Sequence, residues 1–246
     1  MSDLISYGAG INSTALAILL VNEGWCGPIV FADTGCDWPD TYAYMDYFER
    51  EWLAPRGLRV ERLAGMPWQR IKGGLSLIDY CEQSRVLPQA AVRWCTIEWK
   101  VKPIGRYAET HGVTVQHIGI AADEAHRQTT KSRPLCDRNI TRQGCIEIIQ
   151  AEGLDVPPKS GCWICPFQRH EQWRELWRRY PELYERAARL EEATPRTGEG
   201  RHHATLDPAG KMTLRQRQVT FDQQTTMFDD DELDALLIYK PCLCGI

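Results

Sequence analysis

Ser6-Tyr7-Gly8-Ala9-Gly10-Ile11-Asn12-Ser13-Thr14 is a glycine-rich stretch between two apolar segments. It follows the short apolar run Leu4-Ile5 and leads into Ala15-Leu16-Ala17-Ile18-Leu19-Leu20-Val21, which has the composition of a buried helix. A glycine-rich turn between a strand and a helix presents backbone N–H groups and the positive end of the helix dipole to an anion. The stretch therefore predicts a phosphate-binding loop in an α/β fold, and a purely structural turn is the alternative.

Short apolar runs alternate with amphipathic segments along the first half of the chain. We expect strands at residues 4–7, 28–32, 58–63 and 115–120, and helices at 13–23, 40–52 and 97–111. This alternation predicts a doubly wound, mostly parallel sheet with helices on both faces. Such folds bind their ligands at the carboxyl ends of the strands. We therefore expect the site in the loops at 8–13, 33–35 and 121–127.

The second half of the chain has a different composition. Residues 127–142 are rich in basic residues and turn formers, and residues 153–166 in proline, glycine and cysteine. Residues 168–192 indicate a charged, aromatic helical region that is interrupted near Pro181. We therefore divide the chain into a nucleotide-binding α/β domain at 1–127 and a mostly helical, Cys- and Arg-rich extension at 128–246. The extension would complete a metal site and carry a mobile tail.

The overall composition is that of a soluble globular protein, with 43% hydrophobic and 25% charged residues among 246. A net charge of −4 gives no general case for nucleic-acid binding, although it leaves a local basic face open. The N-terminus lacks a secretion signal, and no apolar run approaches the ~20 residues of a membrane span. We expect a cytoplasmic protein that does not enter a membrane.

Ten cysteines are many for a chain without an export signal. In a reducing compartment they favour metal ligands or redox-active thiols over disulfides. The clearest pattern is Cys162-Trp163-Ile164-Cys165-Pro166, because two thiolates at this spacing can bind one metal centre. Cys95 would be a third ligand and Cys145 the fourth. The cysteines alone leave an iron–sulfur cluster and structural zinc equally open, and single cysteines such as Cys36 can also be buried hydrophobes.

The first loop resembles the PP-loop, S-G-G-x-D-S, of the adenine nucleotide alpha hydrolase-like superfamily. Gly10 and Ser13 match this motif. Ala9 stands in place of a glycine, Asn12 in place of the aspartate, and Gly8 in place of the first serine, while Ser6 lies two residues earlier.

Further segments resemble the phosphoadenosine phosphosulfate (PAPS) reductase-like family of that superfamily. Residues 31–42 match its D-T-G-x-x-x-P-x-T pattern, residues 93–104 its R-x-C-x(4)-K-x-x-P segment, and residues 119–127 its G-I-R-x-x-E-x-x-R loop. The chain ends on Cys242-Leu243-Cys244-Gly245-Ile246, which is similar to a mobile C-G-[LI] tail. Two departures stand out: Ala121 replaces an arginine, and Cys95 stands alone where iron–sulfur members have a cysteine pair.

The resemblance implies an adenine nucleotide, either ATP or PAPS, bound with Mg²⁺ and close to a [4Fe–4S] cluster, with Zn²⁺ as the alternative metal. The implied nucleotide- and phosphate-binding residues are Ser6, Gly8, Ala9, Gly10, Asn12, Ser13, Thr14, Asp33, Thr34, Gly35, Asp123, Glu124 and Arg127. The implied metal ligands are Cys95, Cys145, Cys162 and Cys165. Cys244 and Asp33 are the implied catalytic residues, although an Asx-turn is an alternative role for Asp33 and the tail cysteines could instead be exposed thiols or further ligands.

Within this family we expect ATP-dependent adenylation of a nucleic acid or nucleotide, coupled to sulfur transfer from a donor such as a cysteine desulfurase. The alternative is a sulfonucleotide reductase, in which Cys244 attacks sulfur and a thioredoxin-like reductant releases sulfite. A zinc-stabilised adaptor without activity is the third hypothesis, because a fold does not establish an activity. We also expect a homodimer.

Overall fold

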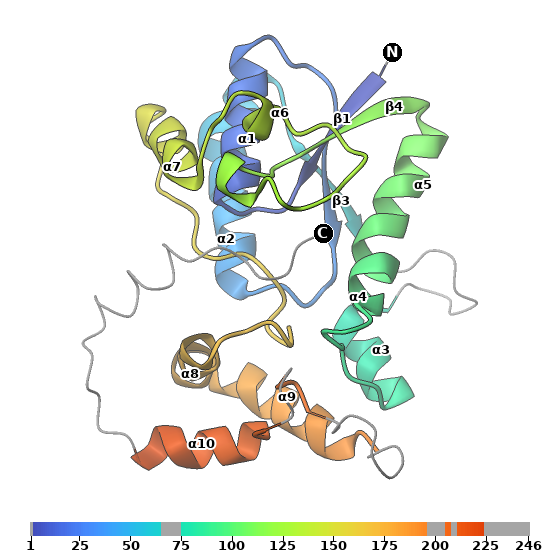
Figure 1. Cartoon of the computed structure of the whole chain (residues 1–246), viewed down its shortest axis with the longest axis vertical. Coiled ribbons are helices and arrows are strands. Elements are labelled where there is room, and N and C mark those ends of the chain that lie inside the picture. The colour runs from blue at the N-terminus through green and yellow to red at the C-terminus, as the bar shows by residue number, and fades with distance from the viewer. Residues whose placement is uncertain (1, 65–74, 196–204, 208–210, 224–246) are drawn as a thin grey trace.

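The computed structural model describes residues 2–64, 75–195, 205–207 and 211–223. Figure 1 shows a sheet flanked by helices, with a further group of helices beyond one end of the sheet. The tail cysteines Cys242 and Cys244 lie outside the described residues.

The sheet has four strands in the order β3-β2-β1-β4, and each strand runs parallel to its neighbours. Its strands are β1 (Ser2–Tyr7), β2 (Ile29–Asp33), β3 (Val60–Ala64) and β4 (Val113–Ile118). β1 and β2 occupy the centre, so their carboxyl ends lie side by side. The predicted α/β fold with a parallel sheet is confirmed.

The helices of the described residues are α1 (Ile11–Asn22), α2 (Pro39–Phe48), α3 (Leu77–Ser84), α4 (Trp94–Thr96), α5 (Lys102–Thr110), α6 (Pro134–Asp137), α7 (Arg142–Ala151), α8 (His170–Arg179), α9 (Pro181–Ala193) and α10 (Leu214–Gln223). A π-helical turn at Glu49–Leu53 extends α2, and another at Ile97–Val101 leads into α5. The predicted interruption near Pro181 separates α8 from α9.

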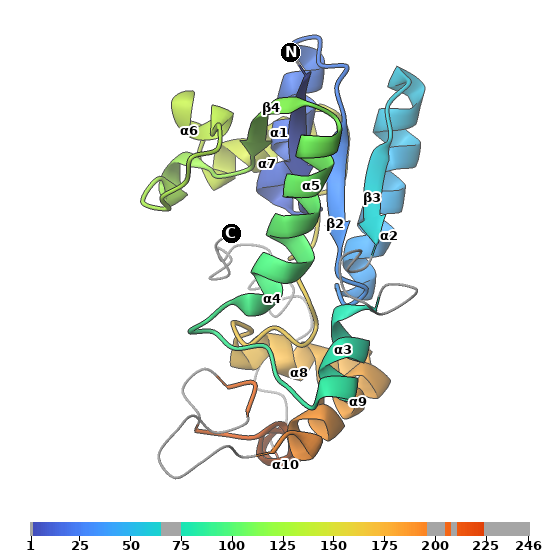
Figure 2. The ribbon, with the colours of Figure 1, turned by 90° about the vertical axis from the view of Figure 1, so that its right-hand side faces the viewer.

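The two faces of the sheet bury alternate residues of the same strands, as the pleat requires. Ile5 and Phe31 belong to the core under α1, α2 and α7. Their neighbours Leu4 and Val30 face the other way and pack with Ile104 of α5. Figure 2 shows α5 on the opposite side of the sheet from α2. Burial on both faces explains why the central strands are continuous apolar runs.

A second core lies beyond the sheet, where α3, α8, α9 and α10 gather at the lower end of Figure 1. Its largest fully buried side chains are Trp99, Trp173 and Tyr184. Two further tryptophans belong to the same core. Trp38 comes from the loop after β2, and Trp163 comes from residues 160–168, here called the cysteine segment. This second core therefore fixes the positions of two loops that come from distant parts of the sequence.

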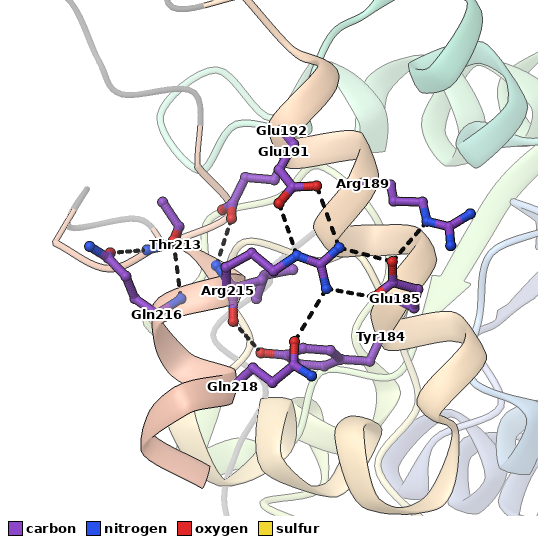
Figure 3. Close-up of polar contacts among 10 residues, drawn as sticks. Tyr184, Glu185, Arg189, Glu191, Glu192, Thr213, Arg215, Gln216 and Gln218 are labelled. Carbon is purple, nitrogen blue, oxygen red and sulfur yellow. Dashed lines mark hydrogen bonds and ion pairs between the residues drawn. The ribbon is translucent and has the colours of Figure 1, made fainter. Parts of the chain in front are cut away.

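Polar contacts hold α10 against α9 (Figure 3). The guanidinium of Arg215 donates to the carboxylates of Glu185 and Glu192. The buried carboxylate of Glu191 accepts from the backbone N–H of Leu214 at 2.6 Å, at the start of α10. The hydroxyl of Tyr184 donates to the carbonyl oxygen of the same Leu214 at 2.7 Å. Because the N–H groups at a helix start have no partner within the helix, the carboxylate acts as a cap.

Helix α7 packs against α1 in the core under the sheet, through Cys145, Ile146 and Ile149. It thereby connects the segment after residue 127 to the α/β core. The division of the chain at residue 127 stays a prediction. No helix within the described ranges combines the length and apolar character that crossing a membrane needs.

Candidate active site

The loop between β1 and α1 presents two backbone amides to one oxygen. The N–H groups of Gly8 and Gly10 donate to the Ser13 hydroxyl oxygen at 3.1 and 3.2 Å. That hydroxyl in turn donates to the Gly10 carbonyl at 3.0 Å. Convergent amides at a helix N-terminus are the arrangement that binds a phosphate oxygen. In the structure these two amides are bonded to the Ser13 hydroxyl, and binding of a phosphate by the loop stays a prediction.

Close packing fixes the position of this loop. Ala9 has a φ of +52°, a left-handed conformation that glycine adopts more readily. Gly119, just after β4, lies so close to α1 that an added Cβ would stand 2.7 Å from the Ser13 nitrogen and 2.9 Å from the Asn12 carbonyl carbon. An added Cβ on Gly10 would stand 2.6 Å from the Ser160 hydroxyl. The loop is thus held between the end of β4 and the cysteine segment.

Polar side chains from the 121–127 loop reach the start of α1. The Asn12 amide nitrogen donates to a Glu124 carboxylate oxygen at 2.9 Å, and Arg127 lies 3.4 Å from the other oxygen. Both Asn12 and Glu124 are 8% exposed. Asp123 accepts from the backbone N–H of Arg142 at 3.1 Å, at the start of α7. The first and third predicted loops therefore meet.

The loop after β2 uses its carboxylates internally. One oxygen of Asp33 accepts from the Gly35 N–H at 2.7 Å and from the Tyr42 hydroxyl at 2.6 Å. This is an Asx-turn, the alternative role that the sequence left open for Asp33. Thr34 donates to Asp37 at 2.7 Å, and its hydroxyl lies 3.3 Å from the Cys162 sulfur. Thr34 therefore approaches the thiols, as do Cys36 and Asp37 of the same loop.

Backbone pairing attaches the cysteine segment to the loop after β2. The N–H of Trp38 donates to the Gly161 carbonyl, and the N–H of Trp163 donates to the Cys36 carbonyl, both at 2.9 Å. Asp37 and Cys162 form an isolated antiparallel bridge between these bonds. The position of Cys162 thus follows from the end of β2.

Five thiols gather at this point, and Cys162 raises the pKa of each of the other four, which are Cys36, Cys81, Cys95 and Cys165. Burial, followed by the charge of Cys162, raises the pKa of Cys165 to about 12. Burial and a hydrogen bond to Cys162 raise the pKa of Cys36. Because thiolates are soft ligands, this group suits zinc or iron–sulfur chemistry.

Lys100 lies next to the thiols, 3.6 Å from a carboxylate oxygen of Asp37. Burial by itself would lower the pKa of the ammonium group. The Asp37 carboxylate and the sulfurs of Cys162 and Cys165 outweigh this effect and raise the pKa above its usual range. Lys100 therefore stays positively charged beside Cys162 and Cys165.

Cys145 lies elsewhere, in the α7 face that packs on α1. The charged groups that influence its pKa are Asp123, Arg142 and Glu124, and burial raises that pKa to about 12. The structure therefore brings Cys95, Cys162 and Cys165 together but not Cys145. In the described part of the chain, no three Cys, His, Asp or Glu side chains are arranged to hold one metal ion. The thiols fit a metal by their chemistry and not by their present geometry.

One cavity of about 460 Å³ joins the two parts of the site. Its phosphate-loop half is formed by Gly8, Gly10, Asn12, Ser13 and Gly119. Its thiol half is formed by Thr34, Cys95, Lys100, Cys162 and Cys165. The predicted residues that line it are Ser6, Gly8, Gly10, Asn12, Ser13, Thr34, Cys95, Glu124, Arg127, Cys162 and Cys165. The other predicted residues of the described chain do not line the cavity: Ala9, Thr14, Asp33, Gly35, Asp123 and Cys145.

Several residues of the cavity wall were not among the predicted site residues, although the basic run that contains Lys131 and Arg142 was considered as a channel for anions. Lys100, Gly119, Lys131, Arg142 and Ser160 all line it. Lys100 and Gly119 lie within the segments that resemble family motifs, so their positions in those motifs could have identified them as site residues. Lys131 and Arg142 belong to the basic segment at 127–142, and they bring positive charge to the wall. A cavity with a phosphate-type loop at one end and thiols at the other suits an anionic, nucleotide-sized ligand.

The comparisons with known proteins bear on the fold and the family. The family model described as phosphoadenosine phosphosulfate reductase domain matches residues 3–148. The crystal structure of phosphoadenylyl-sulfate (PAPS) reductase from Candida auris, in a phosphate complex, is similar in fold, with a TM-score of 0.51 and 16% sequence identity. That similarity covers 66% of this chain and 82% of that chain. No curated protein sequence matches the chain. Since the family model spans more than half of its length, the chain belongs to the phosphoadenosine phosphosulfate reductase domain family.

Proposed function

We propose that this protein is an enzyme that adenylates an acceptor with ATP and then transfers sulfur to it. The observation that carries the proposal is the single cavity whose wall contains both the anion loop and the thiols. The acceptor oxygen would attack the α-phosphorus of ATP, and pyrophosphate would leave. Sulfur held in the thiol half would then displace AMP from the adenylate. The acceptor would be a nucleic acid or a nucleotide.

The phosphate-loop half would bind the nucleotide's phosphates. Negative charge develops on the pyrophosphate as it leaves, and fixed donors aimed at that charge lower the barrier. The amides of Gly8 and Gly10 converge on the Ser13 hydroxyl oxygen. A phosphate oxygen would lie on the side of the loop toward which these amides point. The cations Arg127, Lys131 and Arg142 in the wall would add to the stabilisation.

The thiol half would hold the sulfur. Cys95, Cys162 and Cys165 would be the protein ligands of an iron–sulfur cluster, with zinc as the alternative metal. A cluster would supply thiolate-bound iron close to the phosphates. This assignment is supported by the chemistry of the donors, since their side chains would have to turn toward a common centre. With either metal, the positive charge of Lys100 would stabilise negative charge on the ligand sulfurs.

A sulfonucleotide reductase is the second candidate, and membership of the family favours it. In that reaction the nucleotide already carries an activated sulfate, and a protein cysteine attacks its sulfur. The candidate nucleophile, Cys244, lies outside the described residues.

Anaerobic incubation with ATP or with PAPS distinguishes the candidates. Formation of AMP and pyrophosphate from ATP, dependent on an acceptor and a sulfide source, is the expected result. Release of adenosine bisphosphate and sulfite from PAPS with a dithiol reductant would replace the proposal by the reductase. If the protein turns over neither nucleotide, the non-enzymatic adaptor becomes the remaining hypothesis.

Nucleotide affinity tests the loop separately from the chemistry. Ser13→Ala removes the hydroxyl that orders the loop and is expected to weaken nucleotide binding about fivefold, the value of one hydrogen bond. Ser84→Ala, at the exposed end of α3, is the matched control. Calorimetric titration of both variants gives the comparison. Equal affinities for the parent and Ser13→Ala would remove the loop from the site.

A further inference from the structure

The thiol half of the cavity holds three of the four predicted metal ligands, Cys95, Cys162 and Cys165. Iron–sulfur clusters and structural zinc ions are both bound by four protein donors as a rule. Cys145 lies away from the other three, because α7 packs it into the core against α1. One sulfur ligand of the thiol half is therefore unassigned.

Two further cysteines, Cys36 and Cys81, lie close to these thiols. Both are 0% exposed and belong to the second core. Their relation to Cys162 differs: Cys36 forms a hydrogen bond with it, whereas Cys81 is influenced by its charge. Because the ligands of one metal centre have to lie close to one another, Cys36 is the better placed of the two.

The backbone holds Cys36 beside the cysteine segment. Its carbonyl oxygen accepts from the Trp163 N–H at 2.9 Å, and its own N–H donates to the Thr34 hydroxyl at 3.2 Å. The same hydroxyl lies 3.3 Å from the Cys162 sulfur. Hydrogen bonds of this kind around a metal site fix the positions of its ligands. One set of hydrogen bonds therefore positions both Cys36 and Cys162.

We propose that Cys36 is the fourth protein ligand of a metal centre that Cys95, Cys162 and Cys165 also bind. The inference rests on the metal centre of the proposed function and adds a ligand to it. It also accounts for Cys95, which stands alone where iron–sulfur members of the family have a cysteine pair: the missing sulfur would come from the loop after β2. Binding requires the four side chains to turn toward one point, since no three Cys, His, Asp or Glu side chains of the described residues surround one now.

Cobalt is the probe, because Co²⁺ binds thiolate ligands and the intensity of its thiolate absorption grows with the number of thiolates bound. Co²⁺ is titrated anaerobically into the full chain after removal of any metal. We expect Cys36→Ala to lower the absorption per bound Co²⁺ by about one quarter, the share of one thiolate in a set of four. The same substitution should weaken Co²⁺ binding at least about tenfold. Iron or zinc retained after anaerobic purification should fall in parallel.

Cys81→Ala is the matched control, because Cys81 has the same exposure as Cys36 and belongs to the same core. Each substitution removes one buried sulfur, so a purely structural role of Cys36 predicts similar losses of stability and unchanged Co²⁺ binding in both variants. Unchanged Co²⁺ absorption and affinity in folded Cys36→Ala would overturn the proposal. Loss of a thiolate in Cys81→Ala with retention in Cys36→Ala would assign the ligand to Cys81 and also overturn it.

Circular dichroism establishes that each variant is folded, and a second variant leaves Cys36 in place in case Cys36→Ala does not fold. It combines Cys145→Ala, Cys242→Ala and Cys244→Ala. Four-thiolate absorption in this variant and in Cys81→Ala would support Cys36, and loss of one thiolate in either would overturn the proposal. A parent protein that retains no iron or zinc and binds no Co²⁺ would overturn the metal centre of the proposed function as well. Formation of AMP and pyrophosphate tests the adenylation step independently of these outcomes.

Discussion

The two halves of the cavity are built from different parts of the polypeptide. In the phosphate-loop half, the groups that face the ligand are mostly backbone amides within six residues of one another. In the thiol half, they are side chains from three segments that are up to 128 positions apart, as for Thr34 and Cys162. Local sequence specifies the loop of the first half, although Gly119 and Glu124 join it from the segment after β4. The second half forms only when the chain has folded. Substitutions in the two halves should therefore have different effects on turnover, metal content and nucleotide affinity.

The largest effect is expected in the thiol half. Cys162→Ser should lower turnover at least about 100-fold, because it removes a sulfur from the centre of the thiol group, while nucleotide affinity stays within about twofold. Bound iron or zinc, measured by elemental analysis after anaerobic purification, should fall with it.

Cys145→Ser is the matched control for this substitution. Since Cys145 packs against α1, its replacement should lower stability and leave the metal content at the parent level. Loss of metal in Cys145→Ser would instead show that α7 contributes to the thiol half. A strong loss of nucleotide affinity in Cys162→Ser would mean that the two halves are not separable.

An intermediate effect is expected where backbone approaches backbone in the phosphate-loop half. Gly119→Ala places a Cβ within 3 Å of the start of α1, and backbone cannot move aside as a side chain can. We expect a loss of about 3 kcal/mol in the free energy of unfolding and at least about tenfold weaker nucleotide binding.

Gly105→Ala in α5 provides the contrast, since its Cβ would meet no atom within 4 Å. Replacement of a helical glycine by alanine should stabilise the protein by up to about 1 kcal/mol. Chemical denaturation of both variants tests the pair. If Gly119→Ala is as stable as Gly105→Ala, the loop is less tightly held than its contacts indicate.

The smallest effect concerns Lys159, next to the contact between the two halves. Burial, and then the charge of Arg169, lowers the pKa of Lys159 to about 8. The unfolded chain binds this proton up to a pH of about 10.4, so between pH 8 and 10.4 the unfolded state binds more protons and the contribution of Lys159 to stability rises with pH. Lys159→Met should therefore raise stability at pH 7 by about 1 kcal/mol, and the gain should shrink at pH 10.

Denaturation midpoints at pH 7 and pH 10 give the measurement for Lys159→Met. The variant also loses the hydrogen bond from Lys159 to Gln172, which limits the gain. Lys211→Met, at an exposed lysine, should change neither value. A gain in stability that is the same at both pH values would mean that burial of the charged Lys159 does not destabilise the folded protein.

The strands and helices of the α/β core could be predicted well because their sequence patterns involve residues that are close together in the chain. The predicted strands at 4–7 and 28–32 overlap β1 and β2 closely, and the fold confirms the parallel sheet. Helices α3 and α7 were missed, although Ser76 and Thr141 cap their starts by accepting from backbone N–H groups. Both helices are short and follow segments rich in turn formers, so their caps were not recognised as helix starts.

The thiol half could be predicted only in part. The C-x-x-C spacing identified Cys162 and Cys165, and a family motif identified Cys95. Cys145 was predicted as the fourth ligand, but the helix that carries it packs against α1. The proximity of Cys36 to Cys162 depends on backbone bonds between residues more than 120 positions apart, such as Trp38 and Gly161. No local pattern reports such a contact.

The paired hydrogen bonds between the loop after β2 and the cysteine segment limit how this protein can be recombined with its relatives. Trp38 donates through its indole to the Gln168 side chain, and Gln168 donates to the Trp163 carbonyl, so the two segments share one set of bonds. A chimera that receives only residues 160–168 from another family member would lose these partners. Grafting residues 33–38 together with residues 160–168 would transfer these bonds intact, while Cys95 and Lys100 of the thiol half would still come from the recipient.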